Sequence, residues 1–466
     1  MRRLRGVDGY LWYNETPTNH MHTLKIAVFD PARSDPPDSM DRFAELLDAR
    51  LHLLPSFRWR LLEVPLGLHH PVWVDDPDFL IHNHVRRTVA RAPGGAREMD
   101  EAIGRIAGTP LRRDRPLWEL HFIEGLAGGR VAAVTKIHHA MADGQAAANQ
   151  LLNVLDRMGG IEHEQRWAPE PMPTRRQLVW AALREHPRQA GRLPALVRKT
   201  REGRRAAAEF WRSSEVRPAR PWSGPATFLN TPIDARRTVA TTSIPLAAAQ
   251  ALRMGGVFTL NDVVLEIMTA ALRGVLASRG ELPDGPVVAN VPASTGLLVD
   301  RLFGNSVGLL FVELPVHVPD PSERMKLIGQ QIRAARRANE VAGVELLDEW
   351  LEFVPPLVFR SFSRWYARSR LVRRRPPMMN VVASNVRGPA EEATVCGTPI
   401  SELFSVGPLN IAVGLNITVW SYAGKLNFTV LSCPVQLPDP HVITDALGEA
   451  YRGLRAALGI GPDQGG

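Results

Sequence analysis

The stretch Ile137-His-His-Ala-Met-Ala-Asp-Gly144 lies between two segments with different patterns. The residues before it, Arg130 to Ile137, are mostly β-branched or small and apolar, which is typical of a strand. The residues after it, Ala146 to Met158, carry leucines at helical spacing. The sequence therefore predicts a strand, a short loop and a helix, with two adjacent histidines where the strand ends.

These two histidines cannot serve the same purpose, because neighbouring side chains on extended backbone point to opposite faces. An imidazole titrates near neutral pH, so either His138 or His139 is a candidate general base. Asp143 can order the loop, and Gly144 lets a substrate or another backbone come close. Two other interpretations stay open here: ordinary structural histidines, and a zinc site, which the diverging side chains disfavour.

The spacing His138-His139-x-x-x-Asp143-Gly144 resembles the HHxxxDG motif of the CoA-dependent acyltransferase superfamily. Within it, nearly the whole chain resembles the bacterial bifunctional wax ester synthase/diacylglycerol acyltransferase family. Among the segments that carry this likeness are Arg113–Glu119, Thr259–Leu265 and Ser384–Pro389. The resemblance implies an α/β fold with two chloramphenicol-acetyltransferase-like domains, mixed sheets and a tunnel between the domains.

The resemblance also implies a reaction: transfer of a long-chain acyl group from acyl-CoA to diacylglycerol or to a long-chain alcohol. Acyl-CoA is then a co-substrate, and neither a cofactor nor a metal is expected. By their places in the motif, His139 would take the acceptor's proton, His138 would hold the loop, and Asp143 would be structural. Two alternatives stay open: acylation of a polyketide or glycolipid hydroxyl, and a lipid-inclusion binding protein with weakened catalysis.

Seven further residues in the matching segments are candidates for substrate binding. They are Pro116, Leu117, Trp118, Asn261, Asp262, Ser384 and Asn385. Three of them, Asn261, Ser384 and Asn385, would donate hydrogen bonds to the tetrahedral oxyanion. A scaffold role is the favoured interpretation of the Pro-Leu-Trp element, and capping is the alternative for the Asn-Asp pair at the predicted helix start.

One position departs from the superfamily pattern. Relatives carry an arginine shortly after the strand that begins at Val287, and this arginine pairs with the motif aspartate. Here the position is occupied by Gly296. Three explanations are open: Arg301 replaces the missing arginine, Asp143 has another partner, or the activity is impaired.

At 466 residues the chain is too long for one hydrophobic core. We expect an N-terminal acyltransferase domain over residues 1–165, a basic crossover linker over 166–222 and a C-terminal acyltransferase-like domain over 223–466. Between Arg166 and Arg220 there are 14 basic and 5 acidic residues, so this stretch accounts for the whole net charge of +8. Its prolines predict short helices separated by breaks.

The sequence also bears on location. Two cysteines suggest no disulfide framework, and the basic N-terminus lacks the apolar region of a signal peptide. The uncharged stretch 403–424 is interrupted by glycines and a proline and alternates, which predicts buried strands instead of a membrane span. We therefore expect a cytoplasmic protein, bound peripherally to the inner face of the cell membrane or to lipid inclusions.

Two stretches are candidates for contact with lipid. The linker combines arginines with exposed-looking aromatic residues, and residues 346–372 are more apolar and aromatic than a surface helix requires, which favours a lipid-facing helical hairpin. Basic charge alone would also suit nucleic acid, but no recognition motif accompanies it, so no nucleic-acid partner is expected.

Overall fold

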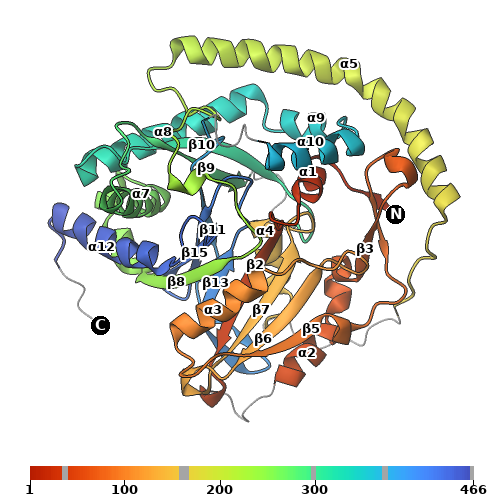
Figure 1. Ribbon diagram of the computed structural model, residues 1–466, viewed down its shortest axis with the longest axis horizontal. Coiled ribbons are helices and arrows are strands. Elements are labelled where there is room, and N and C mark those ends of the chain that lie inside the picture. Colours follow the sequence, from red (N-terminus) through yellow and green to blue (C-terminus); the bar gives the residue numbers. More distant parts are fainter. Residues whose placement is uncertain (34–39, 157–166, 295–300, 370–375, 462–466) are drawn as a thin grey trace.

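The computed structural model describes residues 1–33, 40–156, 167–294, 301–369 and 376–461. Its centre consists of two six-stranded sheets with helices around them (Figure 1). Each sheet contains both parallel and antiparallel strand pairs. The predicted α/β fold with two mixed sheets is confirmed, whereas the tunnel between the domains stays a prediction.

The first sheet carries the histidines. In spatial order its strands are β12 (Thr394–Val395), β13 (Thr398–Val406), β2 (His22–Phe29), β7 (Val131–His138), β6 (Trp118–Glu124) and β5 (Val85–Val89). Helix α3 (Ala96–Ala107) covers one face through apolar side chains such as Ile103 and Ile106. Helices α1 (Gly6–Asn14) and α2 (Met40–Ala49) lie on the other face. Every residue of β2 is buried as a result.

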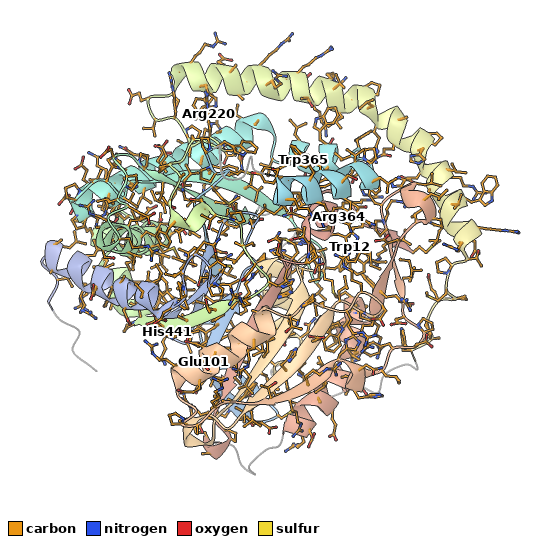
Figure 2. The ribbon with its side chains drawn as sticks, in the orientation of Figure 1. Trp12, Glu101, Arg220, Arg364, Trp365 and His441 are labelled. Carbon is orange, nitrogen blue, oxygen red and sulfur yellow. The ribbon has the colours of Figure 1, made fainter. Side chains whose placement is uncertain are left out.

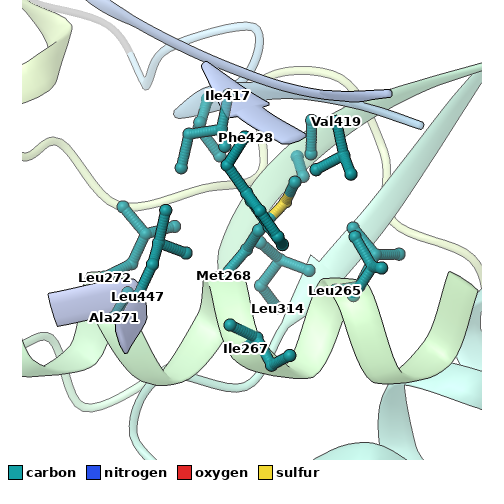
Figure 3. Close-up of a cluster of buried hydrophobic side chains, with 14 of the residues drawn as sticks. Leu265, Ile267, Met268, Ala271, Leu272, Leu314, Ile417, Val419, Phe428 and Leu447 are labelled. Carbon is teal, nitrogen blue, oxygen red and sulfur yellow. The ribbon is translucent and has the colours of Figure 1, made fainter. Parts of the chain in front are cut away.

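The second sheet has an apolar core of its own. In spatial order its strands are β10 (Val307–Leu314), β9 (Val287–Ser294), β11 (Val381–Arg387), β14 (Leu415–Tyr422), β15 (Lys425–Ser432) and β8 (Thr238–Pro245). Three helices cover one of its faces: α7 (Leu260–Ser278), α8 (Pro321–Ala342) and α12 (His441–Ala457). Figure 3 shows Met268 and Leu272 of α7 meeting Ile417 and Phe428 of the sheet.

The two sheets do not follow the order of the chain. Strands β12 and β13 come from the second half of the sequence, yet β13 pairs with β2 and completes the first sheet. The uncharged stretch that begins at Leu403 forms the end of β13 and all of β14, as the predicted buried strands require. The boundaries of the three predicted segments remain predictions. The first sheet contains strands from both the predicted N-terminal and the predicted C-terminal segment.

A third, small sheet lies beside the first. Its strands are β1 (Arg2–Arg3), β4 (Val72–Asp75) and β3 (Trp59–Leu62). Four shorter helices connect these strands: α4 (Gly144–Leu152), α6 (Leu246–Ala251), α9 (Leu346–Leu351) and α10 (Pro356–Arg368). Helices α9 and α10 both contact α1.

The linker differs from its prediction. Instead of short helices it forms one helix of 39 residues, α5 (Arg175–Ser213), which passes through Pro187 and Pro194 and curves over the molecule (Figure 1). A proline has no amide hydrogen, so the carbonyl four residues before it lacks its helical hydrogen bond. Because most side chains of α5 are exposed, these carbonyls can bond to water instead. A capping box between Thr174 and Gln177 begins the helix, and contacts with α8 and α9 hold it.

The predicted hairpin at 346–372 consists of α9 and α10; its last residues lie outside the described part. Across the described ranges, no helix has both the length and the apolar character that crossing a bilayer requires.

A buried acidic residue ties α3 to the second sheet. Asp100 accepts hydrogen bonds from the amide and hydroxyl of Thr241 on β8, at 3.0 and 2.9 Å, and lies 3.2 Å from Nε2 of His441 at the start of α12. The other ring nitrogen of His441 lies 2.8 Å from Asp439. Two carboxylates therefore face one imidazole, and the hydrogen bond to Asp100 raises the pKa of His441 above its ordinary value.

Replacing His441 by alanine should destabilise the protein more at about pH 6 than at about pH 8.5. A raised pKa in the folded state contributes stability that is complete below the ordinary pKa of about 6.5 and is lost as the pH rises through the folded value. Hydrogen bonds to charged groups contribute about 1.5–3 kcal/mol. Thermal unfolding midpoints of both proteins at the two pH values measure the difference, and equal losses would contradict a charged His441.

Candidate active site

The histidines sit where β7 ends and the chain turns into α4. His138 is the last residue of β7 and pairs with His22 of β2. The amide of His139 donates to the carbonyl of Met21 at 2.7 Å, so the backbone is held one residue beyond the strand. Asp143 is the N-cap of α4, and its Oδ1 accepts from the amide of Ala146 at 2.9 Å. The predicted strand, loop and helix are confirmed, although the helix ends earlier than predicted.

His138 is engaged at both ring nitrogens. Its Nδ1 accepts from the amide of Ala140 at 3.1 Å, so Nε2 carries the proton and donates to Glu15 at 3.1 Å. Glu15 also pairs with Arg113 at 2.6 Å. Burial alone would raise the pKa of Glu15, but the hydrogen bond from His138 and the charge of Arg113 outweigh it and lower the pKa to about 2. The ring of Trp12 lies 5.5 Å from that of His138.

His139 has the opposite environment. Its side chain is only partly covered, and its buried Nδ1 has no hydrogen-bond partner among the described residues. Burial lowers the pKa of His139; the residue's own backbone and Asp143 oppose this, and the Lys25 ammonium adds to it. The imidazole is therefore neutral at pH 7 and able to accept a proton.

A segment between β9 and β10, residues 301–306, closes over this loop; we call it the clamp segment. The Oδ2 of Asp143 accepts from Nη2 of Arg301 at 2.5 Å and from the amide of Ser306 at 2.9 Å. The amide of Gly304 donates to the carbonyl of Met141 at 2.6 Å. Of the three explanations for the missing superfamily arginine, the structure supports replacement by Arg301; position 296 itself lies outside the described residues.

Helix α4 and the small sheet hold the clamp segment from outside. Gln150 and Asn149 of α4 donate to the carbonyls of Leu302 and Arg301, at 2.8 and 2.9 Å. The ring of Phe303 lies 5.0 Å from Trp59 and 5.5 Å from Trp73. The clamp segment is thus fixed at both its polar and its aromatic positions.

Asp143 is a buried carboxylate that only accepts hydrogen bonds. Burial would raise its pKa, but the amides of Ala146 and Ser306 and the charge of Arg301 outweigh burial and lower it. Within the described ranges no hydrogen bond joins Asp143 to His139. Since its oxygens and the ring of His138 already have partners, the zinc alternative receives no support.

Gly144 brings strand β11 against the loop. A Cβ atom at Gly144 would approach Cγ2 of Val386 to 3.1 Å, so glycine permits this contact. Side chains alternate along β11, and Ser384 therefore shares the loop side with Val386. Asn385 faces the other way, where its amide lies 3.4 Å from Asn261 at the start of α7. The three predicted oxyanion donors are thus divided between two faces of the sheet.

Asp262 has a local role. The hydroxyl of Thr259 accepts from the amide of Asp262 at 3.1 Å, and Asp262 Oδ2 accepts from the amide of Thr259 at 2.8 Å. Thr259, and not Asn261, is therefore the N-cap of α7. Asp262 completes the capping box, so of its two predicted roles the structure supports capping. With its carboxylate engaged and buried, we no longer expect Asp262 to bind substrate.

Pro116, Leu117 and Trp118 lie in the core of the first sheet. The indole of Trp118 donates to the carbonyl of Phe57 at 2.8 Å and stacks on His84. The carbonyl of Leu117 accepts from the amide of His138 at 2.9 Å. This geometry supports the scaffold interpretation, and we no longer expect these side chains to contact substrate.

Sequence reasoning assigned no role to Asp8 and Asn305, which also meet at the loop. Nδ2 of Asn305 donates to the carbonyl of His139 and to Oδ1 of Asp8, both at 2.7 Å. Because 297 positions separate them, no local pattern could pair them.

A cavity of about 290 Å³ lies elsewhere, between α3, β8 and β13, and is lined by Met99, Thr241 and Phe404 among others. None of the predicted site residues lines it.

Breaking the Asp143–Arg301 pair should destabilise the protein strongly. Removing one partner of a buried pair typically costs about 3–5 kcal/mol. Asp143→Asn and Arg301→Ala should each lower the urea midpoint, and the double variant should add little, because both changes remove one interaction.

Arg33→Ala is the matched control, since Arg33 forms an exposed pair with Glu392 at 2.7 Å and exposed pairs contribute at most about 1 kcal/mol. Additive losses at positions 143 and 301 would contradict the pairing.

Comparisons with known proteins identify the family of the chain. The model of the wax ester synthase/diacylglycerol acyltransferase catalytic domain matches residues 4–264, and the model of that family's C-terminal domain matches residues 303–455. A Mycobacterium tuberculosis H37Rv protein whose name designates a diacylglycerol O-acyltransferase is 38% identical over 460 residues, covering 99% of this chain and 97% of the relative. Another from the same strain is 34% identical, with coverages of 97% and 90%.

Solved structures show the same fold. The wax ester synthase/diacylglycerol acyltransferase of Marinobacter aquaeolei VT8 superposes with a TM-score of 0.69 at 22% identity, covering 99% of this chain and all of the other. A mutant starter condensation domain of rhizomide synthetase, in complex with C8-CoA, gives 0.60 at 12% identity, with coverages of 98% and 95%. The family models and the relatives show that this chain belongs to the wax ester synthase/diacylglycerol acyltransferase family.

Proposed function

We propose that this chain transfers a long-chain fatty acyl group from acyl-CoA to diacylglycerol, forming triacylglycerol, and to long-chain alcohols, forming wax esters. The observation that carries the proposal is the unequal state of the two histidines. Both ring nitrogens of His138 are engaged, by Glu15 and by Ala140, whereas His139 is neutral and its Nδ1 has no hydrogen-bond partner among the described residues. One histidine is thus held in place and the other is available for proton transfer.

In the proposed reaction, the acceptor hydroxyl gives its proton to His139 as its oxygen attacks the thioester carbonyl. The tetrahedral intermediate collapses, the carbon–sulfur bond breaks, and His139 returns the proton to the CoA thiolate. No covalent acyl-enzyme is needed. Ser384 is the predicted oxyanion donor that shares a face with the loop, and the amide of Asn261 or Asn385 can serve only if substrate reaches the other face.

The alternative of a lipid-inclusion binding protein with weakened catalysis depended on the missing superfamily arginine. Arg301 supplies a cation at 2.5 Å from Asp143, so that reason no longer applies. Acylation of a polyketide or glycolipid hydroxyl would use the same histidine and differs only in the acceptor.

We further propose that the protein works at a lipid surface, at the inner face of the cell membrane or on lipid inclusions. Four apolar side chains of α10 are each more than half exposed: Leu357, Val358, Phe362 and Trp365. Exposed arginines, such as Arg364, accompany them (Figure 2). Exposed apolar residues next to cations suit insertion into an anionic interface. Helix α5 adds a long, exposed basic surface.

The decisive assay supplies purified protein with labelled palmitoyl-CoA and a panel of acceptors: diacylglycerol, hexadecanol and a hydroxylated glycolipid. Labelled triacylglycerol or wax ester is the expected product. Label found only in the glycolipid would favour the alternative acceptor, and transfer to none of them would remove the proposed function.

His139→Ala should reduce transfer by roughly 10²–10⁴-fold, the usual contribution of a positioned general base, without lowering the unfolding midpoint. His138→Ala should act mainly on stability, because it leaves Glu15 and the amide of Ala140 without their buried partner. Initial rates and unfolding midpoints of both variants decide this. The opposite pattern would reverse the two roles.

Binding to anionic vesicles should have a salt-sensitive and a salt-resistant component. Charge contributes about 1 kcal/mol per basic residue near the surface and is screened by salt, whereas apolar insertion is not. The five basic residues proposed for the first component are Arg198, Lys199, Arg201, Arg204 and Arg205, all exposed on α5. Their replacement by glutamine should remove most of the salt-sensitive binding in flotation assays.

Replacing Leu357, Phe362 and Trp365 by serine should remove the salt-resistant component. Phe359→Ser is the matched control: Phe359 belongs to the segment predicted to face lipid, but it is buried against Tyr10 and Tyr13. Its replacement should lower stability and leave binding of the folded fraction intact. Flotation unaffected by either set would show that neither α5 nor α10 docks.

A further inference from the structure

The backbone of His139 is held by a polar link that no local sequence pattern reveals. We infer that Asp8 is a positioning residue for His139 and acts through the side chain of Asn305. This inference rests on the proposed role of His139 as general base. Asp8 lies in the first turn of α1, and Asn305 belongs to the clamp segment.

The hydrogen bonds define the link. Nδ2 of Asn305 donates to the carbonyl of His139 and to Oδ1 of Asp8, each at 2.7 Å, and the amide of Asn305 donates to the same Oδ1 at 3.0 Å. Of the two polar atoms of the Asn305 side chain, only the nitrogen can donate, and it carries two hydrogens, so the orientation of this side chain is fixed. A Cβ atom on Gly304 would lie 3.3 Å from Oδ2 of Asp8, which shows how closely Asp8 lies against the clamp segment.

This link acts where β7 no longer supports the chain. The amide of His139 already donates to Met21, and its carbonyl accepts from Asn305, so the peptide groups on both sides of its Cα are held. The direction of the ring follows from the position of this backbone. Misplacement of a catalytic group by about 1 Å can lower the rate 10²-fold. If the carbonyl of His139 loses its hydrogen bond to Asn305, kcat should therefore fall.

Charged neighbours make the link sensitive to pH. Burial raises the pKa of Asp8 to about 7; the bonds from Asn305 oppose this, Asp348 of α9 adds to it, and Arg301 opposes it. Because the carboxylate accepts two hydrogen bonds from Asn305, its protonation weakens the link. On its acid side, the pH profile of activity should therefore contain a step near pH 7 from protonation of Asp8. A second step, from protonation of His139, should lie below the ordinary pKa of histidine.

Asp348 provides a matched control. It is also a carboxylate at the first turn of α1, where it accepts from the amide of Val7 at 2.7 Å, and burial raises its pKa too. It makes no bond to Asn305 in the described structure. Asp348→Asn therefore disturbs the docking of α1 and leaves the link to His139 in place.

The experiment compares Asp8→Ala, Asp8→Asn, Asn305→Ala and Asp348→Asn in the full chain with palmitoyl-CoA and diacylglycerol. Asp8→Ala and Asn305→Ala should each lower kcat by roughly 10–10²-fold with little change in KM, and the double variant should add little. Asp8→Asn keeps an acceptor oxygen, so it should recover most of the rate while losing the step near pH 7. Asp348→Asn should keep the rate, and it should keep the Asp8 step but move it to lower pH, because the charge of Asp348 contributes to the raised pKa of Asp8.

Hydrogen exchange provides a second readout that needs no activity. Backbone amides of residues 139–144 should exchange faster in Asp8→Ala and Asn305→Ala than in the wild type, and at the wild-type rate in Asp348→Asn. Unchanged exchange in the first two variants, or equal effects of all three, would overturn the inference. If the wild type transfers to no acceptor, the proposed function fails, while the exchange rates still decide whether Asp8 positions the loop.

Discussion

The buried carboxylate of Asp143 is the constraint on which the site depends. Taking an isolated carboxylate out of water costs several kcal/mol, so it must be fully provided with partners. The amide of Ala146 in α4 donates one hydrogen bond to it, and Arg301 and the amide of Ser306 in the clamp segment donate two more. One charge thereby joins the loop of the first sheet to a segment between two strands of the second. The catalytic geometry follows from this junction, and Asp143 need not take part in proton transfer.

Local features of this arrangement can be predicted from sequence. Alternation on extended backbone separates His138 from His139, and the structure gives them opposite environments, one tied to Glu15 and one without a described partner. The strand, loop and helix around them follow from periodicity. Arg301 could be named as a candidate partner of Asp143 but not chosen, because the choice depends on how residues 301–306 fold back over the loop.

The remaining features depend on contacts between distant parts of the chain. Asp8 and Asn305 are 297 positions apart, and their pairing requires α1 and the clamp segment to be in place. The Ser384–Asn385 segment was predicted as one group of donors, but the twofold alternation of β11 places the two side chains on opposite faces. The prolines of α5 favoured separate helices; the structure keeps one helix because its surface is exposed and its neighbours support it.

The pairing of β13 with β2 has a consequence for how the protein is made. Ser401 of β13 bonds to the carbonyl of Val28 across 373 positions, so β2 stays an open edge until the ribosome has synthesised most of the chain. An unpaired strand edge is a site for association with other chains. During synthesis, the sheet of the N-terminal half therefore stays incomplete until β13 has been made, and chaperones can cover its open edge in the meantime. For the same reason, production of that half alone would give an unfinished sheet with a permanently exposed edge.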